Sequence, residues 1–361
     1  MKMFPNLEKR FTKEPLKVLE AQRLAHLIAF APVTFQVSRL MVKFGIFQML
    51  ADTRDGLTMD EVITNTKLSR YAVKVLLEAS LTAGTILFEN ERFVISKAGW
   101  FLLTDPLVSV NLRFNHDVNY LGMFNMEEAL LNGKPEGLKV FGQWKTIYEG
   151  LSSLPVDAQK SWFEFDHFYS DNSFDEALDI VFSYNTTNLL DVGGNTGRWA
   201  LRCVDYNKDV NVTIMDLPQQ LGLMKNHISG KTGEERISGY GANLLDKNSP
   251  FPKGYDAIWM SQFLDCFSEE EITSIVTRAA ESMDEKSRLF IMETLWDRQV
   301  NDVAAYCLTQ ISLYFSVMAN GNSKMYYSDD MIRCVEAGGV KVEKIHDGLR
   351  SGHSILVCRK A

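Results

Sequence analysis

Hydrophobic and polar positions change their spacing near residue 185 of this 361-residue chain. Before that point, most apolar runs have the spacing of amphipathic helices, as in VSRLMVKFGIFQMLAD at residues 37–52. After it, short apolar runs such as NLLDVGG at 188–194 alternate with helical segments such as GRWALRCVDYN at 197–207. This alternation predicts an α/β fold in which a doubly wound parallel sheet is covered by helices on both faces.

The C-terminal half contains enough apolar runs for a complete sheet. The predicted strands lie within residues 188–194, 210–216, 236–245, 255–265 and 288–296, and a closing hairpin is predicted within 339–348 and 353–360. A helix is predicted at 270–283. A second, unusually aromatic helix is predicted at 161–182, and it offers side chains either for a pocket or for interdomain packing.

The N-terminal segment, up to about residue 110, predicts helices followed by a β-hairpin. Thr58 stands three residues before a glutamate, which is capping-box spacing, while Ser69 and Gly84 bracket a further helical run. ILFENERFVIS at 86–96 places two apolar runs around a polar turn. This order is typical of winged-helix modules, which often bind DNA. The segment has little basic excess, so a scaffold or dimerisation role is favoured.

Composition and charge exclude several classes of protein. A length of 361 residues favours two domains, and a net charge of −8 argues against nucleic-acid binding. No apolar run approaches the roughly 20 residues that span a bilayer, and the N-terminus lacks the apolar core of a signal peptide. The five cysteines form no CxxC pair and the histidines are dispersed. We therefore expect reduced thiols, a cytoplasmic location, no membrane partner and no metal site.

The glycine loop LLDVGGNTG at 189–197 is the first candidate binding site. Glycines let the backbone approach a ligand, and Asp216 ends the next strand, where an acidic residue meets a ribose diol. The glycines do not follow the dinucleotide spacing GxGxxG, and Asp191 would repel a pyrophosphate. An ammonium and a sulfonium would be attracted to Asp191, so S-adenosylmethionine is favoured over NAD. Asp191 could also stabilise the loop by accepting backbone hydrogen bonds.

Five motifs carry a resemblance to a known family. In order they are LLDVGGNTG, VTIMDLP, GANLL, YDAIWMSQFLDCFSEEE and RLFIMETLW. Together they resemble the cofactor motifs of class I S-adenosylmethionine-dependent O-methyltransferases, most closely the caffeate/acetylserotonin-type small-molecule group. The N-terminal helices and hairpin resemble the dimerisation domain of those enzymes. The similarity covers nearly the whole chain.

The resemblance implies an architecture. It is a Rossmann-like S-adenosylmethionine-binding doubly wound sheet with an N-terminal α-helical winged-helix dimerisation domain. We expect the dimerisation domain at 1–110, a helical connector that contributes to the substrate pocket at 111–184, and the cofactor domain at 185–361. It also implies a homodimer formed through the N-terminal domain.

By the same resemblance, the glycine loop and the next strand would hold most of the cofactor. Gly193 and Gly194 would hold its methionine part, Asp216 would take the ribose hydroxyls, and Leu217 would pack on the adenine. Asn195 replaces the central glycine of the family's GGGTG loop. Asparagine tolerates left-handed backbone angles better than most residues, so we expect the loop to keep its shape.

Three further positions are assigned to the cofactor by resemblance. Asn243 and Leu244 match positions beside the adenine that family members usually fill with Asp-Met or Asp-Phe, and an amide can still form hydrogen bonds there. Ser261 falls where plant members often have a lysine near the cofactor. S-adenosylhomocysteine would be the product left in this site.

The acceptor pocket is predicted from two segments. FDHFYSD, which begins at Phe165, resembles the family's FNxxM segment, so Asp166 and Tyr169 would face the acceptor. Phe315 and Met318 would come from the helix that covers the acceptor pocket, although their periodicity alone would make them core residues. These aromatic side chains and the family favour a small, aromatic, hydroxylated acceptor.

The position of the general base departs from the family. The family's catalytic histidine lies in a motif like LHDWSDEE, and here FLDCFSEEE places Asp265 at that position, while the supporting glutamate matches about Tyr326. An aspartate with an ordinary pKa of about 4 is a weaker base than histidine, but burial would raise that pKa. Asp265 could instead cap the helix that begins near Ser268, or accept a hydrogen bond at the strand end.

Three mechanisms therefore stay open. Asp265 or His167 takes the acceptor proton in the first. In the second, an acceptor that arrives ionised is methylated through proximity alone. In the third, the chain binds S-adenosylmethionine or S-adenosylhomocysteine without methylating, as a regulatory protein of the same fold.

Overall fold

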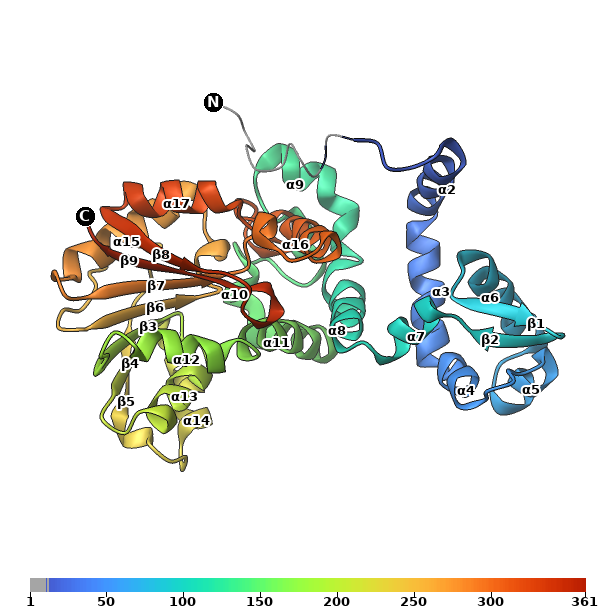
Figure 1. Cartoon of the computed structure of the whole chain (residues 1–361), viewed down its shortest axis with the longest axis horizontal. Helices are drawn as coiled ribbons and strands as arrows, with labels where there is room; N and C mark the ends of the chain where they lie inside the picture. The colour runs from blue at the N-terminus through green and yellow to red at the C-terminus, as the bar shows by residue number, and fades with distance from the viewer. Residues whose placement is uncertain (1–10, 12) are drawn as a thin grey trace. The chain divides into compact units, whose positions relative to one another are not determined.

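The structure is a computed structural model that describes residue 11 and residues 13–361 (Figure 1). It divides into two compact units, one ending at His116 and the other running from Asp117 to Ala361. Most of the segment expected to be a connector packs inside the second unit. A Cβ atom on Gly122 would lie 2.0 Å from Met318 Sδ, so the two chain segments are in close contact.

The first unit consists of helices and one hairpin, as predicted. Its elements are α2 (Val18–Ala29), α3 (Ala31–Lys43), α4 (Ile46–Asp52), α5 (Met59–Asn65), α6 (Arg70–Ala83), β1 (Ile86–Glu89), β2 (Arg92–Ile95), α7 (Lys97–Thr104) and α8 (Pro106–Phe114). The predicted caps are confirmed: Thr58 forms a capping box on α5, Ser69 caps α6, and Gly84 ends α6 in a left-handed conformation. Asn90 and Glu91 both have positive φ, as a two-residue hairpin turn requires.

The single helix expected at 37–52 is two helices. Gly45 has a φ of +71° and separates α3 from α4. Helix α2 has no buried residue, and its apolar side chains include Ile28, which is 66% exposed. Among the described residues, no single helix has the length and apolar character to cross a membrane, although the bent pair α2 and α3 meets both requirements together.

The second unit is built on a seven-stranded sheet in the order β5-β4-β3-β6-β7-β9-β8. The strands are β3 (Asn188–Val192), β4 (Asn211–Asp216), β5 (Ile237–Gly241), β6 (Ala257–Ser261), β7 (Arg288–Glu293), β8 (Val340–His346) and β9 (Ser354–Lys360). Strands β3 to β7 are parallel, whereas β9 runs antiparallel to β7 and to β8. The predicted strands and closing hairpin are all confirmed.

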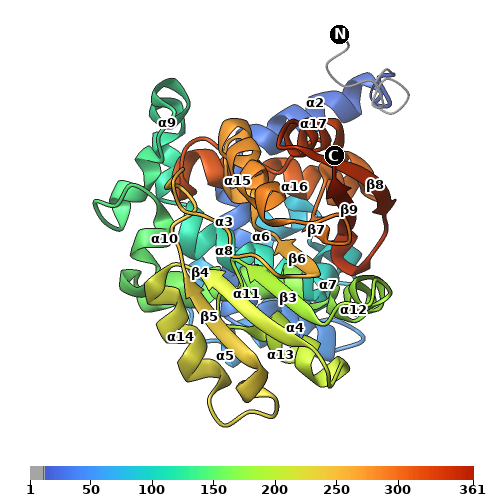
Figure 2. The same cartoon turned by 90° about the vertical axis from the view of Figure 1, so that its left-hand side faces the viewer.

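Helices cover both faces of this sheet, as Figures 1 and 2 show. On one face lie α12 (Phe174–Phe182), α13 (Arg198–Tyr206) and α14 (Pro218–Ile228), and on the other lie α15 (Glu269–Ser282) and α17 (Ser328–Ala337). The unit also contains α9 (Met126–Asn132), α10 (Ile147–Gly150), α11 (Val156–Asp171) and α16 (Asp302–Tyr314). Side chains alternate along each strand: Leu190 packs with α15 and α17, while Leu189 packs with α12, α13 and α14. Both faces of the central strands are therefore buried.

The order of the strands creates a crevice at one edge of the sheet. The chain moves outward from β3 to β5 and then returns to β6, which lies directly beside β3. The loops that leave the carboxyl ends of β3 and β6 therefore run in opposite directions. In open α/β sheets, ligands bind at such a switch point.

Candidate active site

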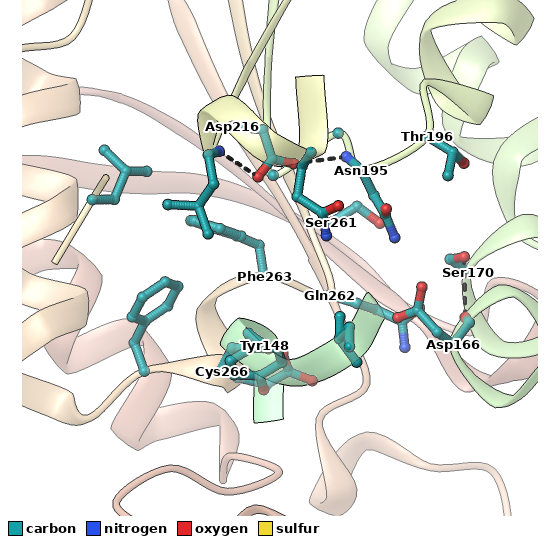
Figure 3. Close-up of a pocket in the computed structure, with 18 of the residues that line it drawn as sticks. Tyr148, Asp166, Ser170, Asn195, Thr196, Asp216, Ser261, Gln262, Phe263 and Cys266 are labelled. Carbon is teal, nitrogen blue, oxygen red and sulfur yellow. Dashed lines mark hydrogen bonds between the residues drawn. The ribbon is translucent and has the colours of Figure 1, made fainter. Parts of the chain in front are cut away.

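A cavity of about 600 Å³ lies at this switch point. Its lining comes from the loops after β3, β4 and β6, from α11, and from the segment around Phe315. Figure 3 shows Asp216 and Asn195 toward one end of the cavity and Tyr148 with Cys266 toward the other. This volume lies in the range of sites that hold small molecules.

The loop between β3 and α13 depends on its glycines. Gly193 has a φ of +73°, and a Cβ atom there would lie 2.3 Å from the ring of Phe263. A Cβ atom on Gly194 would lie 2.4 Å from the Asp191 carboxylate. Asn195 has a φ of +50°, so the predicted left-handed asparagine is confirmed. Side chains at either glycine would displace the groups that line the cavity.

Asp191 is a buried carboxyl group beside this loop. It is 2% exposed, and its Oδ2 has no hydrogen-bond partner in the described part of the chain. Burial, with a smaller contribution from the neighbouring Asp216, raises the pKa of Asp191 to about 8. A buried carboxyl without a partner is unfavourable unless a ligand supplies a donor or a cation.

Asp216 joins the end of β4 to the glycine loop. Its Oδ2 accepts a hydrogen bond from the backbone N–H of Asn195 at 2.9 Å, and its Oδ1 accepts one from Leu217 at 2.7 Å (Figure 3). Burial raises the pKa of Asp216, although both hydrogen bonds oppose that shift. Its carboxylate is therefore held in one orientation at the wall of the cavity.

The remaining residues predicted for the cofactor lie around the same end of the cavity. Leu217 and Leu244 are apolar lining residues, and Leu244 is buried. Asn243 also lines the cavity, but its Oδ1 accepts a hydrogen bond from the backbone N–H of Leu245 at 3.0 Å. Ser261 ends β6, and its buried Oγ has no partner among the described residues.

Gln262 was not predicted, and it follows Ser261 in an unusual conformation. Its φ is +44°, and its buried Oε1 lacks a hydrogen-bond partner within the described residues, as does Asn195 Oδ1. Strained backbone of this kind clusters at ligand sites. S-adenosylmethionine is polar along its length and carries an ammonium group. It fits the unpaired polar atoms, including Asp191 Oδ2, and the close backbone approach that Gly193 and Gly194 allow.

Asp265 lies at the other end of the cavity, in a short 3-10 turn, Leu264–Cys266. It is 4% exposed, and burial raises the pKa of its carboxyl to about 7, although a hydrogen bond from Cys266 Sγ opposes the shift. Asp265 does not cap α15. Ser268 does so itself, in a capping box with Glu271. The helix-cap interpretation of Asp265 is therefore wrong.

A second buried carboxyl group, not predicted from the sequence, supports this turn. Glu293 ends β7, and its Oε1 accepts hydrogen bonds from the backbone N–H groups of Phe263 at 3.1 Å and Leu264 at 2.8 Å. Burial and the nearby Asp265 hold the pKa of Glu293 well above its usual range. Glu293 ends an apolar strand, as Asp216 does. An acidic residue at the end of an apolar run is therefore the sequence signal that could have identified Glu293 as a site residue.

Tyr326, which matches the position of the family's glutamate, has a structural role. It is 2% exposed, and its hydroxyl donates a hydrogen bond to the Phe267 carbonyl at 2.6 Å. It therefore holds the chain just after Asp265. Asn320 acts similarly, because its Nδ2 donates to the Cys266 carbonyl at 2.5 Å.

Helix α11 supplies two predicted polar residues to the cavity, Asp166 and His167. Burial and the nearby Asp265 raise the pKa of Asp166 to about 7. Burial and the Arg198 guanidinium lower the pKa of His167 to about 4, and His167 Nε2 is buried without a partner in the described chain. At neutral pH, His167 is therefore uncharged and a weaker base than Asp265.

The aromatic lining differs in part from the prediction. Phe165 and Phe315 line the cavity, as expected. Trp162 joins them, and its Nε1 donates a hydrogen bond to the Tyr314 hydroxyl at 2.7 Å. Tyr148, which was not predicted, adds a buried hydroxyl next to Cys266.

Tyr169 and Met318 were predicted to face the acceptor, but the structure places both outside the cavity lining. Tyr169 is 5% exposed and packs on Phe165, with the ring centroids 5.0 Å apart. Met318 is fully buried beside Gly122. The segment Phe315–Ala319 is a π-helical turn, so a step of three residues from Phe315 does not return to the same face.

No group of three or more His, Cys, Asp or Glu side chains among the described residues is arranged to hold a metal ion. The polar groups of the cavity are instead distributed along its length. A ligand that matched them would extend from Asp216, past the glycine loop, toward the turn that carries Asp265.

Two family profiles match the chain in tandem. The Dimerisation2-like domain matches residues 22–93, and the O-methyltransferase domain matches residues 170–332. Among curated relatives, the L-tyrosine C(3)-methyltransferase of Streptomyces lavendulae is 21% identical over 303 residues, which cover 83% of this chain and 81% of the relative. Human acetylserotonin O-methyltransferase is 21% identical over 325 residues, which cover 84% of this chain and 89% of the relative.

Solved structures share the fold. The mitomycin 7-O-methyltransferase MmcR matches with a TM-score of 0.71 at 17% identity, covering 94% of this chain and 98% of that one. Human N-acetylserotonin methyltransferase in complex with S-adenosylmethionine matches with a TM-score of 0.65 at 16% identity, covering 97% and 99%. The chain thus carries an O-methyltransferase family domain behind a Dimerisation2-like domain, and it is an S-adenosylmethionine-dependent methyltransferase.

Proposed function

We propose that the enzyme methylates the hydroxyl group of a small aromatic acceptor and that Asp265 takes the proton. One observation carries the proposal. Asp265 is buried in the same cavity as the glycine cradle, with a pKa of about 7. A general base works best when its pKa lies near the operating pH. His167, with a pKa of about 4, is the weaker candidate.

We assign the cofactor to the end of the cavity that contains Asp216. Asp216 would accept hydrogen bonds from the ribose hydroxyls, Leu217 and Leu244 would pack on the adenine, and Asp191 would face the ammonium group. When bound, S-adenosylmethionine supplies a methyl group activated by its sulfonium, and S-adenosylhomocysteine remains. The buried, partnerless Oδ2 of Asp191 supports its assignment.

The acceptor would lie between the aromatic side chains and the Asp265 turn. Trp162, Phe165 and Phe315 would hold its ring and exclude water. Asp265 would remove the hydroxyl proton while the oxygen forms its bond to the methyl carbon. Burial holds the pKa of Tyr148 well above its usual range, so its hydroxyl stays protonated and can donate a hydrogen bond to the acceptor.

An acceptor screen with product mass spectrometry tests this proposal. The names of the relatives specify methylation of different atoms. They include an L-tyrosine C(3)-methyltransferase, an acetylserotonin O-methyltransferase and a phenazine-1-carboxylate N-methyltransferase. The screen therefore includes L-tyrosine, N-acetylserotonin and simple phenols and catechols. We expect an O-methyl product. A product methylated only on carbon or nitrogen would contradict the proposal.

Cofactor affinity should depend on pH through Asp191. Below its pKa of about 8 the carboxyl holds a proton, which must leave before the carboxylate can pair with an ammonium. Affinity for S-adenosylhomocysteine should therefore rise about 10-fold or more between pH 6 and pH 8, with release of up to about one proton. Calorimetric titration in two buffers of different ionisation enthalpy measures both the affinity and the number of protons released. Asp191→Asn should bind more weakly at pH 8 and lose most of this slope; a wild-type affinity independent of pH would exclude the pairing.

We also propose a homodimer formed through the first unit. Helix α2 buries none of its residues, and Leu24, Ile28 and Phe30 are all exposed, which supports a protein partner for this surface. Ile28→Glu should convert a dimer into a monomer, as measured by light scattering after size exclusion. Gln22→Glu adds the same charge at an exposed polar position of α2 and should leave the dimer intact. A monomeric wild-type protein would refute this proposal.

A cytoplasmic location is the last part of the proposal. The five cysteines are all free, which supports a reducing compartment.

A further inference from the structure

The cavity has a strongly acidic lining. Seven of its residues are acidic: Glu149, Asp166, Asp171, Asp191, Asp216, Asp265 and Glu271. Among the described lining residues, Arg198 is the only arginine or lysine, and it forms an ion pair with Asp171. The lining therefore contains far more acidic than basic side chains, and a cationic occupant would stabilise their ionised forms.

Most of these carboxyl groups already have a role. Asp191 and Asp216 are assigned to the cofactor, and Arg198 neutralises Asp171. Glu271 completes the capping box of α15, and Glu149 accepts a hydrogen bond from the backbone N–H of Lys145 at 3.3 Å. Asp166 and Asp265 remain, and neither forms an ion pair with any residue that the structure describes.

These two carboxyl groups approach the acceptor region from different elements. Asp166 comes from α11, and Asp265 from the turn after β6. Asp265 is buried and Asp166 is half-buried. Desolvation raises the pKa of Asp166, and Asp265 raises it further because like charges in a poorly solvated space repel each other. A cation between them would relieve that repulsion. The aromatic faces of Trp162 and Phe165 would also favour a cation nearby.

We propose that the acceptor carries a protonated amine, and that Asp166 binds it while Asp265 serves the reacting hydroxyl. The assignment rests on the proposed methyl transfer, because that transfer gives Asp265 its separate task. An acceptor with a carboxylate would find no unpaired arginine or lysine among the described lining residues, since Arg198 forms an ion pair with Asp171. The substrate class is thus an aminoalkyl phenol or a related basic aromatic alcohol.

Binding of three matched compounds to the protein saturated with S-adenosylhomocysteine tests the inference. The compounds are 4-(2-aminoethyl)phenol, the neutral 4-ethylphenol and the anionic 4-hydroxyphenylacetate. At pH 7.5 we expect the amine to bind about 10-fold more tightly than 4-ethylphenol, and the anion to bind most weakly. Equal affinities, a preference for the anion, or no binding of the amine at millimolar concentration would each overturn the inference.

Variants then locate the charge that selects the amine. Asp166→Asn keeps the shape of the side chain and should reduce the amine preference to about 2-fold or less. Asp157→Asn is the matched control, because Asp157 is exposed on the same helix. This variant should leave the preference for the amine unchanged. An undiminished preference in Asp166→Asn would refute the role of Asp166. The wild-type comparison remains informative even if Asp166→Asn does not fold.

The same titrations separate this inference from the proposed function. Binding of S-adenosylhomocysteine is measured first, without any phenol. Failure of that step would refute the cofactor assignment itself. Normal cofactor binding combined with no order among the three phenols would refute only the amine-bearing acceptor.

Discussion

Asp216→Ala should weaken binding of S-adenosylhomocysteine by about 100-fold or more. A hydrogen bond to a charged acceptor contributes about 1.5–3 kcal/mol, and a ribose presents two hydroxyl groups to this carboxylate. The substitution also removes both bonds that tie the end of β4 to the backbone of Asn195 and Leu217. The glycine loop should therefore lose order along with its ligand contact. Calorimetric titration measures the loss directly.

Two variants separate these contributions. Asp209→Ala removes an exposed carboxylate just before the same strand and should leave the affinity unchanged. Asp216→Asn retains an acceptor oxygen but loses the charge, so its affinity should fall between those of wild type and Asp216→Ala. Wild-type affinity in a folded Asp216→Ala protein would place the cofactor elsewhere in the cavity.

The cofactor end of the site could be predicted because its chemistry is local in the sequence. Asp191, Gly193 and Gly194 belong to one loop, and Asp216 ends the next strand of a parallel sheet. Once alternating strands and helices are recognised, the carboxyl ends of neighbouring strands must lie together. The structure brings these residues to one cavity for that reason.

The acceptor end was harder to predict because it depends on contacts between distant segments. The helix predicted at 161–182 breaks near Ser173, whose hydroxyl donates a hydrogen bond to the carbonyl of Arg350, far along the chain. Met318 lies outside the cavity lining, in a π-helical turn for which a single sequence offers no clear signal. The sequence also gives no indication that Gln262 has a positive φ.

For Asp265, the sequence predicts the position of the residue but not its chemical properties. Its position could be read from FLDCFSEEE, but the basicity of its carboxyl could not. The raised pKa arises from burial, and the turn that carries Asp265 is held by Glu293, which lies about 30 residues further along the chain. Residue identity alone made Asp265 a poor base, whereas its environment makes it a suitable one.

The largest effect that we expect on catalysis comes from Asp265→Asn. Removal of a general base should lower kcat about 100- to 10,000-fold for an acceptor whose hydroxyl is protonated at the assay pH. Affinity for S-adenosylhomocysteine should stay within about 2-fold, because Asp265 precedes Cys266, which lies at the other end of the cavity from Asp216 (Figure 3). In the wild type, kcat/KM should rise with pH through about 7, since the base acts only when ionised.

The fold should tolerate this substitution. The folded-state pKa of Asp265 is raised, so the folded protein binds its proton more tightly than the unfolded chain does, and stability is lost as pH rises through about 7. Asparagine does not ionise. At pH 8, Asp265→Asn should therefore unfold at the same temperature as wild type or higher, and thermal denaturation checks this before any kinetic comparison.

Acceptors of graded acidity distinguish a base from proximity alone. A nitrophenol is ionised at neutral pH and needs no base, so Asp265→Asn should lower its turnover less than about 10-fold. An equal loss for acidic and ordinary phenols would mean that Asp265 positions the acceptor rather than removing its proton. If Asp265→Asn lowers the turnover of every acceptor only slightly, and His167→Ala is also active, then orientation of the acceptor rather than a general base accounts for the rate. Only a loss that grows with the pKa of the acceptor hydroxyl identifies Asp265 as the group that takes the proton.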